Sequence, residues 1–356
     1  MLKHVGSTQI ASDAALDFVL ALRRRWADTL YPHLRAEFDA AVPRSVAQDP
    51  AAIAASVHAL PMYAWFAWLE RASQKMLWRA VGDAVKNSRV GPDKRGRDFD
   101  PASVTLDPTL ELPAWYTDWD IHIQPGGIWR AEGSALTYEL GAKLVMLGEN
   151  DDYRFHHLFV ETAIPKRAYR RIVDLGCGFG KSTWPFKRTF AQADVIGVDL
   201  AAPCLELAAL RAAERGLAIE FRQANVVATG LGSGSADLVT STMLVHEVPV
   251  DVLPQIFSES ARVLAPGGLL RFLDFQRTGD LFRDLAMIEH GERNNEPYMP
   301  PMMSADLVAM ARRAGLVHVR WTAFDERGAG RLDALAWPSR REWHFPWAVL
   351  EAEKPA

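Results

Sequence analysis

Five residues in one short region of the sequence have the types and spacing to hold a ligand. Asp174, Gly176, Gly178 and Gly180 alternate in the stretch DLGCGFG, and Asp199 follows Gly180 by 19 residues at the end of the next β-branched stretch. Glycines at a turn from a strand into a helix let the backbone approach a ligand closely, because no Cβ atom interferes. A carboxylate at the end of the following strand can accept hydrogen bonds from both hydroxyls of a ribose. The spacing therefore favours a loop that binds a nucleoside.

Two other glycine-loop motifs do not fit this segment. A phosphate-binding P-loop needs a glycine five residues before Gly180, and Leu175 stands there. A dinucleotide fingerprint needs its third glycine where the chain has Lys181. What remains is Asp-x-Gly-x-Gly-x-Gly, with an acid closing the next strand.

With these residues the segment resembles the class I S-adenosylmethionine-dependent methyltransferases, from about residue 171 to the end of the chain. The resemblance implies that the glycine loop holds the methionine part of S-adenosylmethionine, Asp199 the ribose and Leu200 the adenine. Asn225 stands where an aspartate commonly binds the adenine amino group, and its amide oxygen can accept the same hydrogen bond. The stretch ARVLAPGGLLRFLDF is similar to the family's fifth strand. The alternative is a nucleotide fold that binds another ligand or none. The cofactor-binding residues expected from the resemblance are Asp174, Gly176, Gly178, Gly180, Asp199, Leu200, Asn225, Val226 and Thr242.

A histidine and a glutamate follow the fourth expected strand of the sheet. His246 and Glu247 lie in MLVHEVPVD, at the carboxyl edge where such sheets bind ligands. The stretch resembles a segment of small-molecule O-methyltransferases in which a His-Asp pair supplies the general base, although Glu247 replaces the aspartate and Val248 an aromatic residue. We expect His246 and Glu247 to be catalytic, with His246 as the base for a hydroxyl acceptor. The alternatives are that His246 only orients the substrate or is structural.

Two further segments carry candidate substrate-binding residues. Residues 115–129 contain three tryptophans, and they form an aromatic wall with polar groups or, alternatively, an aromatic-stapled loop. Residues 276–307 follow the fifth expected strand and are too long for a plain connection, which favours a lid. The expected substrate-binding residues are Trp119, His122, Trp129, His290, Asn294, Tyr298 and Met299.

The chain divides into two parts with different periodicity. Residues 11–41, 51–85 and 134–147 have apolar residues at helical spacing, which predicts an all-α N-terminal domain over 1–150, and the same spacing returns over 151–163. After residue 165, short β-branched stretches alternate with helical ones, which predicts a doubly wound α/β sheet over 151–356. The resemblance implies a Rossmann-like sheet that is mostly parallel, with an antiparallel last strand within 341–354. The N-terminal domain would cover the substrate, form a homodimer interface, or both.

Composition excludes several classes of function. The net charge of −4 gives no positive field for a phosphate backbone, so we expect no nucleic-acid partner. Two cysteines cannot build a disulfide framework or a cysteine zinc site, and we expect no metal. The apolar stretch 14–22 contains Asp17 and precedes three arginines, which is unlike a signal peptide. No stretch approaches the roughly 20 apolar residues of a membrane span, so we expect a cytoplasmic protein.

These observations together predict an enzyme that transfers a methyl group from S-adenosylmethionine to a small molecule, with oxygen as the favoured atom. The content of 12 tryptophans favours an aromatic or apolar acceptor. Methylation at nitrogen, sulfur or carbon is the alternative. A repurposed protein that binds the cofactor and catalyses a cyclisation or assists a partner is another.

Overall fold

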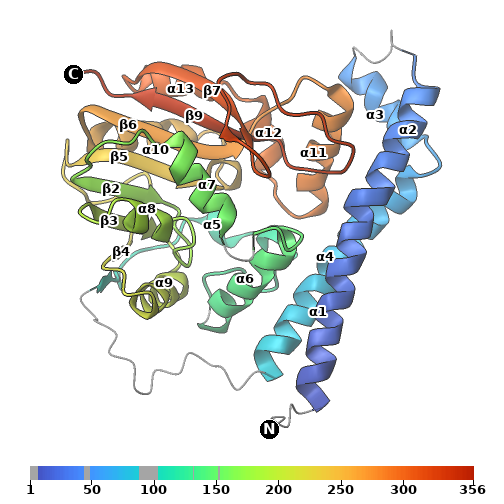
Figure 1. The fold of residues 1–356 in the computed structure, drawn as a ribbon, viewed down its shortest axis with the longest axis horizontal. Coiled ribbons are helices and arrows are strands. Elements are labelled where there is room, and N and C mark those ends of the chain that lie inside the picture. Colours follow the sequence, from blue (N-terminus) through green and yellow to red (C-terminus); the bar gives the residue numbers. More distant parts are fainter. Residues whose placement is uncertain (1–6, 44–48, 88–102, 131, 151–152) are drawn as a thin grey trace.

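The protein is built around one twisted β-sheet with helices on both faces, here described from a computed structural model (Figure 1). The structure describes residues 7–43, 49–87, 103–130, 132–150 and 153–356. Within these residues nine strands follow the order β1-β4-β3-β2-β5-β6-β9-β7-β8. The strands are β1 (Val104–Thr105), β2 (Arg171–Leu175), β3 (Asp194–Asp199), β4 (Glu220–Gln223), β5 (Ala236–Thr242), β6 (Leu264–Phe275), β7 (Val317–Asp325), β8 (Gly330–Arg331) and β9 (Trp347–Glu353).

The central strands are parallel, as the alternation of strands and helices predicted. β2 pairs in parallel with β3 and β5, β3 pairs with β4, and β5 with β6. β9 lies between β6 and β7 and runs antiparallel to both. The prediction of a doubly wound sheet with an antiparallel last strand is therefore confirmed. β7 and β8 were not predicted.

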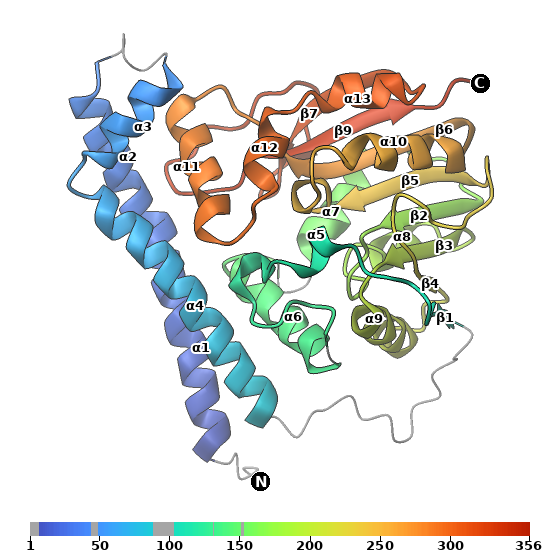
Figure 2. The same ribbon diagram turned by 180° about the vertical axis from the view of Figure 1, so that it is seen from behind.

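Helices cover the two faces of the sheet, which explains why its inner strands are almost continuously apolar. α7 (Arg154–Ala163) and α8 (Trp184–Thr189) lie on one face, and α10 (Leu253–Val263) and α13 (Leu307–Arg313) on the other (Figures 1 and 2). The remaining elements of this part are α9 (Ala202–Glu214), the 3-10 turn η5 (Val245–Glu247), α11 (Leu281–Arg293) and α12 (Met299–Ser304).

The N-terminal residues form an elongated helical layer beside the sheet (Figure 1). The two long helices predicted over 11–41 and 51–85 are each broken. A π-helical turn at Trp26–Leu30 separates α1 (Ser7–Arg25) from α2 (Tyr31–Ala41), and α3 (Pro50–His58) meets α4 (Tyr63–Asn87) at 87°. Prolines explain both breaks, since Pro32 lies in the first turn of α2 and Pro61 lies between α3 and α4. α1 and α4 pack side by side (Figure 1).

The segment that leads to the sheet also departs from an all-α domain. β1 adds a parallel edge strand to β4, with Val104 opposite Phe221. Between β1 and β2 the chain forms α5 (Ala114–Thr117), the 3-10 turn η4 (Ile121–Ile123) and α6 (Glu132–Val145). Edge pairing over two residues has no sequence pattern long enough to detect, so this strand was missed.

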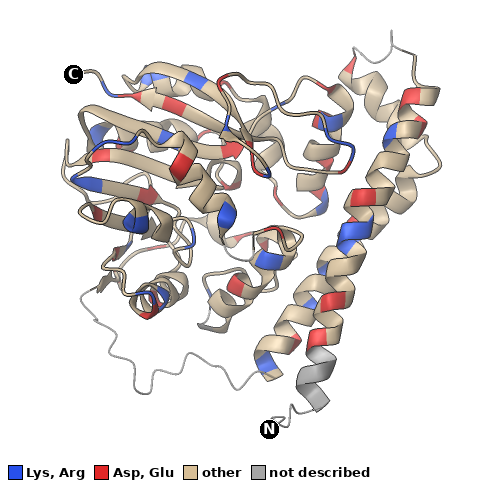
Figure 3. Cartoon of the chain, in the orientation of Figure 1, with Lys and Arg blue, Asp and Glu red and all other residues tan. Residues whose placement is uncertain are grey.

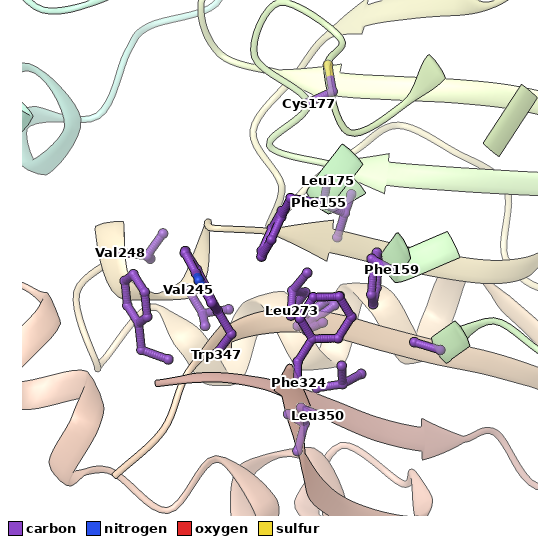
Figure 4. Close-up of a cluster of buried hydrophobic side chains, with 14 of the residues drawn as sticks. Phe155, Phe159, Leu175, Cys177, Val245, Val248, Leu273, Phe324, Trp347 and Leu350 are labelled. Atoms are coloured by element: carbon purple, nitrogen blue, oxygen red, sulfur yellow. The ribbon is translucent and has the colours of Figure 1, made fainter. Parts of the chain in front are cut away.

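One cluster of buried hydrophobic residues runs through both parts of the chain, from Trp26 to Ala352. Figure 4 shows its section between α7 and the sheet, where the Phe155 ring packs at 4.8 Å from that of Trp347 and edge-on at 5.4 Å from that of Phe324, between ring centroids. A second, smaller cluster lies between α1, α4 and α6. The domain boundary expected at residue 150 stays a prediction, because the larger cluster contains residues from both sides of it.

Charged side chains of both signs are interspersed over the described chain (Figure 3). Among the described residues, no single helix has the length and apolar character to cross a membrane, whereas the bent pair α3 and α4 passes that test together by length and composition.

Candidate functional site

The glycine loop follows β2 and adopts a backbone that other residues resist. Gly176, Gly178 and Gly180 have φ angles of 69°, 52° and 89°, all in the left-handed region. A Cβ atom on Gly176 would lie 2.8 Å from Leu244 Cδ1. Close approach and positive φ therefore both require glycine here, as the spacing predicted.

Asp174 lies beneath the loop and organises it. Its side chain is fully buried, and its Oδ2 accepts hydrogen bonds from the hydroxyls of Ser182 at 2.6 Å and Thr183 at 2.7 Å. Burial raises the pKa of Asp174 to about 6, against the opposing hydroxyl hydrogen bonds. The carboxylate holds the two ends of the loop together.

Asp199 closes β3 next to the loop. One carboxylate oxygen accepts the Gly178 N–H at 2.8 Å, and the other accepts the Ala201 N–H at 2.8 Å. Burial raises its pKa, while these backbone hydrogen bonds lower it. Each carboxylate oxygen has two lone pairs, so Asp199 is fixed in orientation and still able to accept hydrogen bonds from a ligand.

A cavity, here called the loop cavity, opens beside these residues. Among the residues predicted for the cofactor, it is lined by Gly176, Gly178, Asp199, Leu200, Val226 and Thr242. Asp174, Gly180 and Asn225 are not in its lining. Asn225 Oδ1 accepts the Val227 N–H at 3.2 Å instead, within its own turn. Sequence reasoning missed the contribution of the N-terminal part, which supplies Trp115, Tyr116, Ile128 and Tyr138.

Two hydroxyl groups of the loop cavity are available to bind a polar ligand. The hydroxyls of Thr242 and Tyr116 are buried without a hydrogen-bond partner among the described residues. Unpaired buried hydroxyls are costly, and a polar ligand in the cavity would satisfy them. Together with Asp199 and the close-approaching loop, they fit a nucleoside with an amino-acid tail.

A second cavity, here called the helix cavity, lies between the carboxyl edge of the sheet and the N-terminal helices. Tyr138, Lys181, Met243 and Glu247 line both cavities, so the two adjoin. The remaining lining of the helix cavity is Arg23, Gln74, Trp78, His122, Ala142, Val145, Met146, His246, Phe275, His290, Glu296, Phe345 and Trp347. A ligand in one cavity can therefore face a ligand in the other.

Lys181 stands at the junction of the cavities. Its ammonium lies 5.1 Å from the ring centroid of Tyr138 and 5.5 Å from that of Phe179. Burial lowers the pKa of Lys181 to about 8. Aromatic faces stabilise this cation but do not neutralise it.

His246 forms a buried pair with an aspartate that closes the neighbouring strand. Its Nδ1 lies 2.7 Å from Asp274 Oδ1, and its Nε2 lies 3.8 Å from Glu247 Oε1. Asp274 is itself oriented by the Val245 N–H at 3.0 Å. Burial lowers the pKa of His246, but the Asp274 carboxylate outweighs burial, so the pKa is above its ordinary value. Asp274 fixes the ring so that Nδ1–H donates to it and Nε2 remains for the cavity.

His122 joins the N-terminal part to this edge through its ring. Nδ1 lies 2.8 Å from Glu296 Oε1, and Nε2 lies 3.1 Å from Glu247 Oε1. Burial lowers the pKa of His122, but the two carboxylates raise it to about 10. At neutral pH both ring nitrogens donate, and the imidazolium holds Glu247 at the junction of the cavities.

The backbone at His122 is strained. His122 and Ile123 have φ angles of 57° and 61°, which cost about 1–2 kcal/mol for each non-glycine residue. The His122 carbonyl accepts hydrogen bonds from Gln74 and Trp78 of α4. Such strain persists only where surrounding contacts fix it.

The other predicted substrate residues divide into two groups. Trp119 and Trp129 line a smaller side cavity with His122 and Glu247, and His290 lines the helix cavity, where Glu70 holds its Nδ1. Three residues line neither the loop cavity nor the helix cavity. Asn294 caps α11 through the His290 carbonyl, the Tyr298 hydroxyl donates to the Trp115 carbonyl, and Met299 is fully buried.

Comparison with known proteins agrees with this arrangement. Residues 172–268 match a family profile described as a methyltransferase domain. Residues 172–268 thus form a methyltransferase domain. The strand order, with the last strand inserted antiparallel, agrees with that assignment.

The relatives of this methyltransferase domain cover only part of the chain. Demethylmenaquinone methyltransferase of Thermus thermophilus is 34% identical over 138 residues, which are 39% of this chain and 60% of the relative. Ubiquinone biosynthesis O-methyltransferase of Bordetella avium is 31% identical over 157 residues, which are 41% of this chain and 62% of the relative. The chain thus spans about 60% of each. A phosphoethanolamine N-methyltransferase structure from Haemonchus contortus covers 64% of this chain and 59% of its own, at 15% identity and a TM-score of 0.45.

Several residues of the two cavities and their surroundings were missed by sequence reasoning. Asp274 had a detectable signal, since it is an acid at the end of an apolar strand, as Asp199 is. Arg23 and Glu296 had none, because their neighbours in space are distant in sequence. Among the described residues, no three His, Cys, Asp or Glu side chains are arranged to hold a metal ion.

Proposed function

We propose that the protein methylates a small-molecule acceptor, with S-adenosylmethionine in the loop cavity and the acceptor in the helix cavity. The observation that carries the proposal is the junction of the two cavities at Tyr138, Lys181, Met243 and Glu247. Methyl transfer requires that donor and acceptor meet in a site from which water is excluded. The cofactor, when bound, supplies a methyl group already activated on a sulfonium.

The residues of the loop cavity would bind and orient the cofactor. Asp199 accepts hydrogen bonds from the ribose hydroxyls, and Leu200 packs against the base. The buried hydroxyls of Thr242 and Tyr116 gain the partners that they lack. The backbone of the loop lies against the amino-acid tail.

We assign the proton transfer to His246, and oxygen as the methylated atom. Asp274 accepts the Nδ1–H, so that Nε2 is the basic nitrogen and can take the proton of an acceptor hydroxyl. The Asp274 carboxylate raises the pKa of His246 against the effect of burial, and a more basic imidazole accepts a proton more readily. Asp274 stabilises the imidazolium that forms.

The walls of the helix cavity favour an acceptor with an aromatic ring. Trp78, Tyr138, Phe275, Phe345 and Trp347 all contribute to its lining. Flat rings pack well against such walls. Two relatives are named for quinones, which are rings of this kind. A homodimer and a cytoplasmic location remain predictions from the sequence.

Two measurements test the proposal. Isothermal titration with S-adenosylhomocysteine should show binding with a stoichiometry of one per chain, and its absence would remove the proposed cofactor. Incubation with methyl-labelled S-adenosylmethionine and a fractionated small-molecule extract should then label one compound. NMR of the product should place the methyl group on oxygen. A methyl group on nitrogen, sulfur or carbon would contradict the role of His246 as a base for a hydroxyl.

A further inference from the structure

One cation in the helix cavity has no anionic partner within hydrogen-bonding distance among the described residues. Arg23, in the last turn of α1, is 6% exposed and lines this cavity. Its Nη1 donates to the neutral amide oxygen of Gln74 at 2.5 Å, while Nε is buried without a partner among the described residues. A buried charge is expensive unless it is paired and hydrogen-bonded.

The acids around the cavity are already matched. Glu296 and Glu247 face the ring of His122, and Glu70 faces both His290 and Arg293. Burial lowers the pKa of Arg23 to about 10, and the more distant Glu70 raises it only in part. Arg23 therefore remains charged at neutral pH while the nearby carboxylates bind other donors.

Arg23 also differs from the other unmatched cation, Lys181. Lys181 lines both cavities, so a carboxylate in either one could be its partner. Arg23 lines the helix cavity but not the loop cavity. It belongs to α1, in the layer of N-terminal helices beside the sheet (Figure 2), whereas His246 belongs to η5 after β5.

We propose that the acceptor is an aromatic carboxylic acid and that Arg23 binds its carboxylate. The inference rests on the proposed function, since it names the substrate class of the same site. The guanidinium matches a carboxylate in shape and charge, and this pairing is strongest where water is excluded. The ring lies between the aromatic walls, with its reacting group toward His246.

The proposal also gives a function to the N-terminal helices. α1 supplies Arg23, α4 supplies Gln74 and Trp78, and α6 supplies Ala142 and Val145. The methyltransferase match begins only at residue 172. Recognition of the acceptor thus comes largely from residues outside the matched domain.

The test compares acids with their uncharged amides. Benzoate, salicylate, 4-hydroxybenzoate and cinnamate are titrated calorimetrically, each beside its amide, into full-length protein saturated with S-adenosylhomocysteine. At least one acid should bind about tenfold to a hundredfold more tightly than its amide, as expected for a hydrogen-bonded charge pair. If no acid in this set binds more tightly than its amide, the proposal is wrong.

Variants of the arginine locate the effect. Arg23→Met should abolish the preference for the acid, and Arg23→Lys should retain only part of it, because an ammonium cannot form the two-pronged contact. Arg25→Met is the matched control, since Arg25 lies on the same helix and is exposed. It should leave the preference unchanged. A preference that survives in Arg23→Met would overturn the assignment.

Two further readouts separate the possible failures. Without ligand, Arg23→Met should melt at a higher temperature than the wild type, because an uncompensated buried charge is removed. A lower melting temperature would show that Arg23 is structural and would contradict the proposal. If S-adenosylhomocysteine itself does not bind, the proposed function fails. If it binds but the acids show no preference, only this inference fails.

Discussion

The two adjoining cavities are built by different means. The loop cavity depends on backbone: three left-handed glycines, and one carboxylate that is fixed by two N–H groups. The helix cavity depends on side chains, which come from α1, α4, α6, α11 and the ends of β6 and β9. A binding site that depends on left-handed glycines tolerates few substitutions, whereas a cavity lined by side chains can be changed one residue at a time. This difference teaches that donor binding is local and constrained, while acceptor binding is assembled from distant parts.

The two cavities also differ in their charges. Asp199 is the one acid that the described lining contributes to the loop cavity besides the shared Glu247. The helix cavity is lined both by the N-terminal helices and by α11, which are joined by side-chain contacts such as Arg293 with Glu70 and His58 with Glu289. Its shape therefore depends on how two parts of the chain are held together.

The largest effect on turnover should come from removing His246, the proposed base of the helix cavity. His246→Ala is expected to lower kcat by about two to four powers of ten, because a positioned base contributes that much to proton transfer. Affinity for S-adenosylhomocysteine should change less than threefold, as measured by calorimetry. His318→Ala, at an exposed position of β7, is the control. A loss of turnover below about fivefold in His246→Ala would exclude the role as base.

A substitution in the loop cavity should instead lower affinity for the cofactor product. Asp199→Asn removes the negative charge and one of the two backbone acceptors, so affinity for S-adenosylhomocysteine should fall about tenfold to a hundredfold. Asp194→Asn, at the exposed start of the same strand, should leave it unchanged. Circular dichroism checks that the fold persists. Unaltered affinity in Asp199→Asn would remove the ribose assignment.

The contrast between the cavities also explains what the sequence could reveal. Six parallel or antiparallel strands, the glycine loop and Asp199 were predicted because each depends on residues close in sequence. Asn225 does not line the loop cavity, because its side chain bonds within its own turn, and that direction was not predictable from the sequence. Arg23 was considered only as one of three arginines after the apolar stretch 14–22, because its partner Gln74 is 51 residues away. β1 was missed, since two residues carry no periodicity.

The contacts of His122 with Glu296 and Glu247 should make the stability of the protein depend on pH. The pKa of His122 is raised from 6.5 to about 10 by Glu296 and Glu247, against burial. A raised pKa in the folded state gives stability that is complete below pH 6.5 and is lost as pH rises toward 10. The free energy of unfolding should thus fall over this range, by at most about 1.4 kcal/mol per pH unit. In His122→Asn, which tolerates the left-handed backbone, this fall should be smaller. Urea titrations at pH 7 and pH 9 measure the free energy of unfolding, and an equal fall in the wild type and in His122→Asn would contradict the ion-pair assignment.

The smallest expected effect comes from a change in side-chain packing, which should alter acceptor binding in the helix cavity but not donor binding in the loop cavity. A Cβ atom on Gly141 of α6 would collide with the ring of Trp78, which lines the helix cavity, while Gly82 of α4 has open space around its Cα. Gly141→Ala should lower the free energy of unfolding by about 1–3 kcal/mol and weaken acceptor binding, because Trp78 must move. Gly82→Ala, the matched control, should raise the free energy of unfolding by about 0.5–1 kcal/mol through helix propensity. Neither change should alter affinity for S-adenosylhomocysteine, since the loop cavity does not contain Trp78. Donor affinity that falls in Gly141→Ala would mean that the two cavities respond as one.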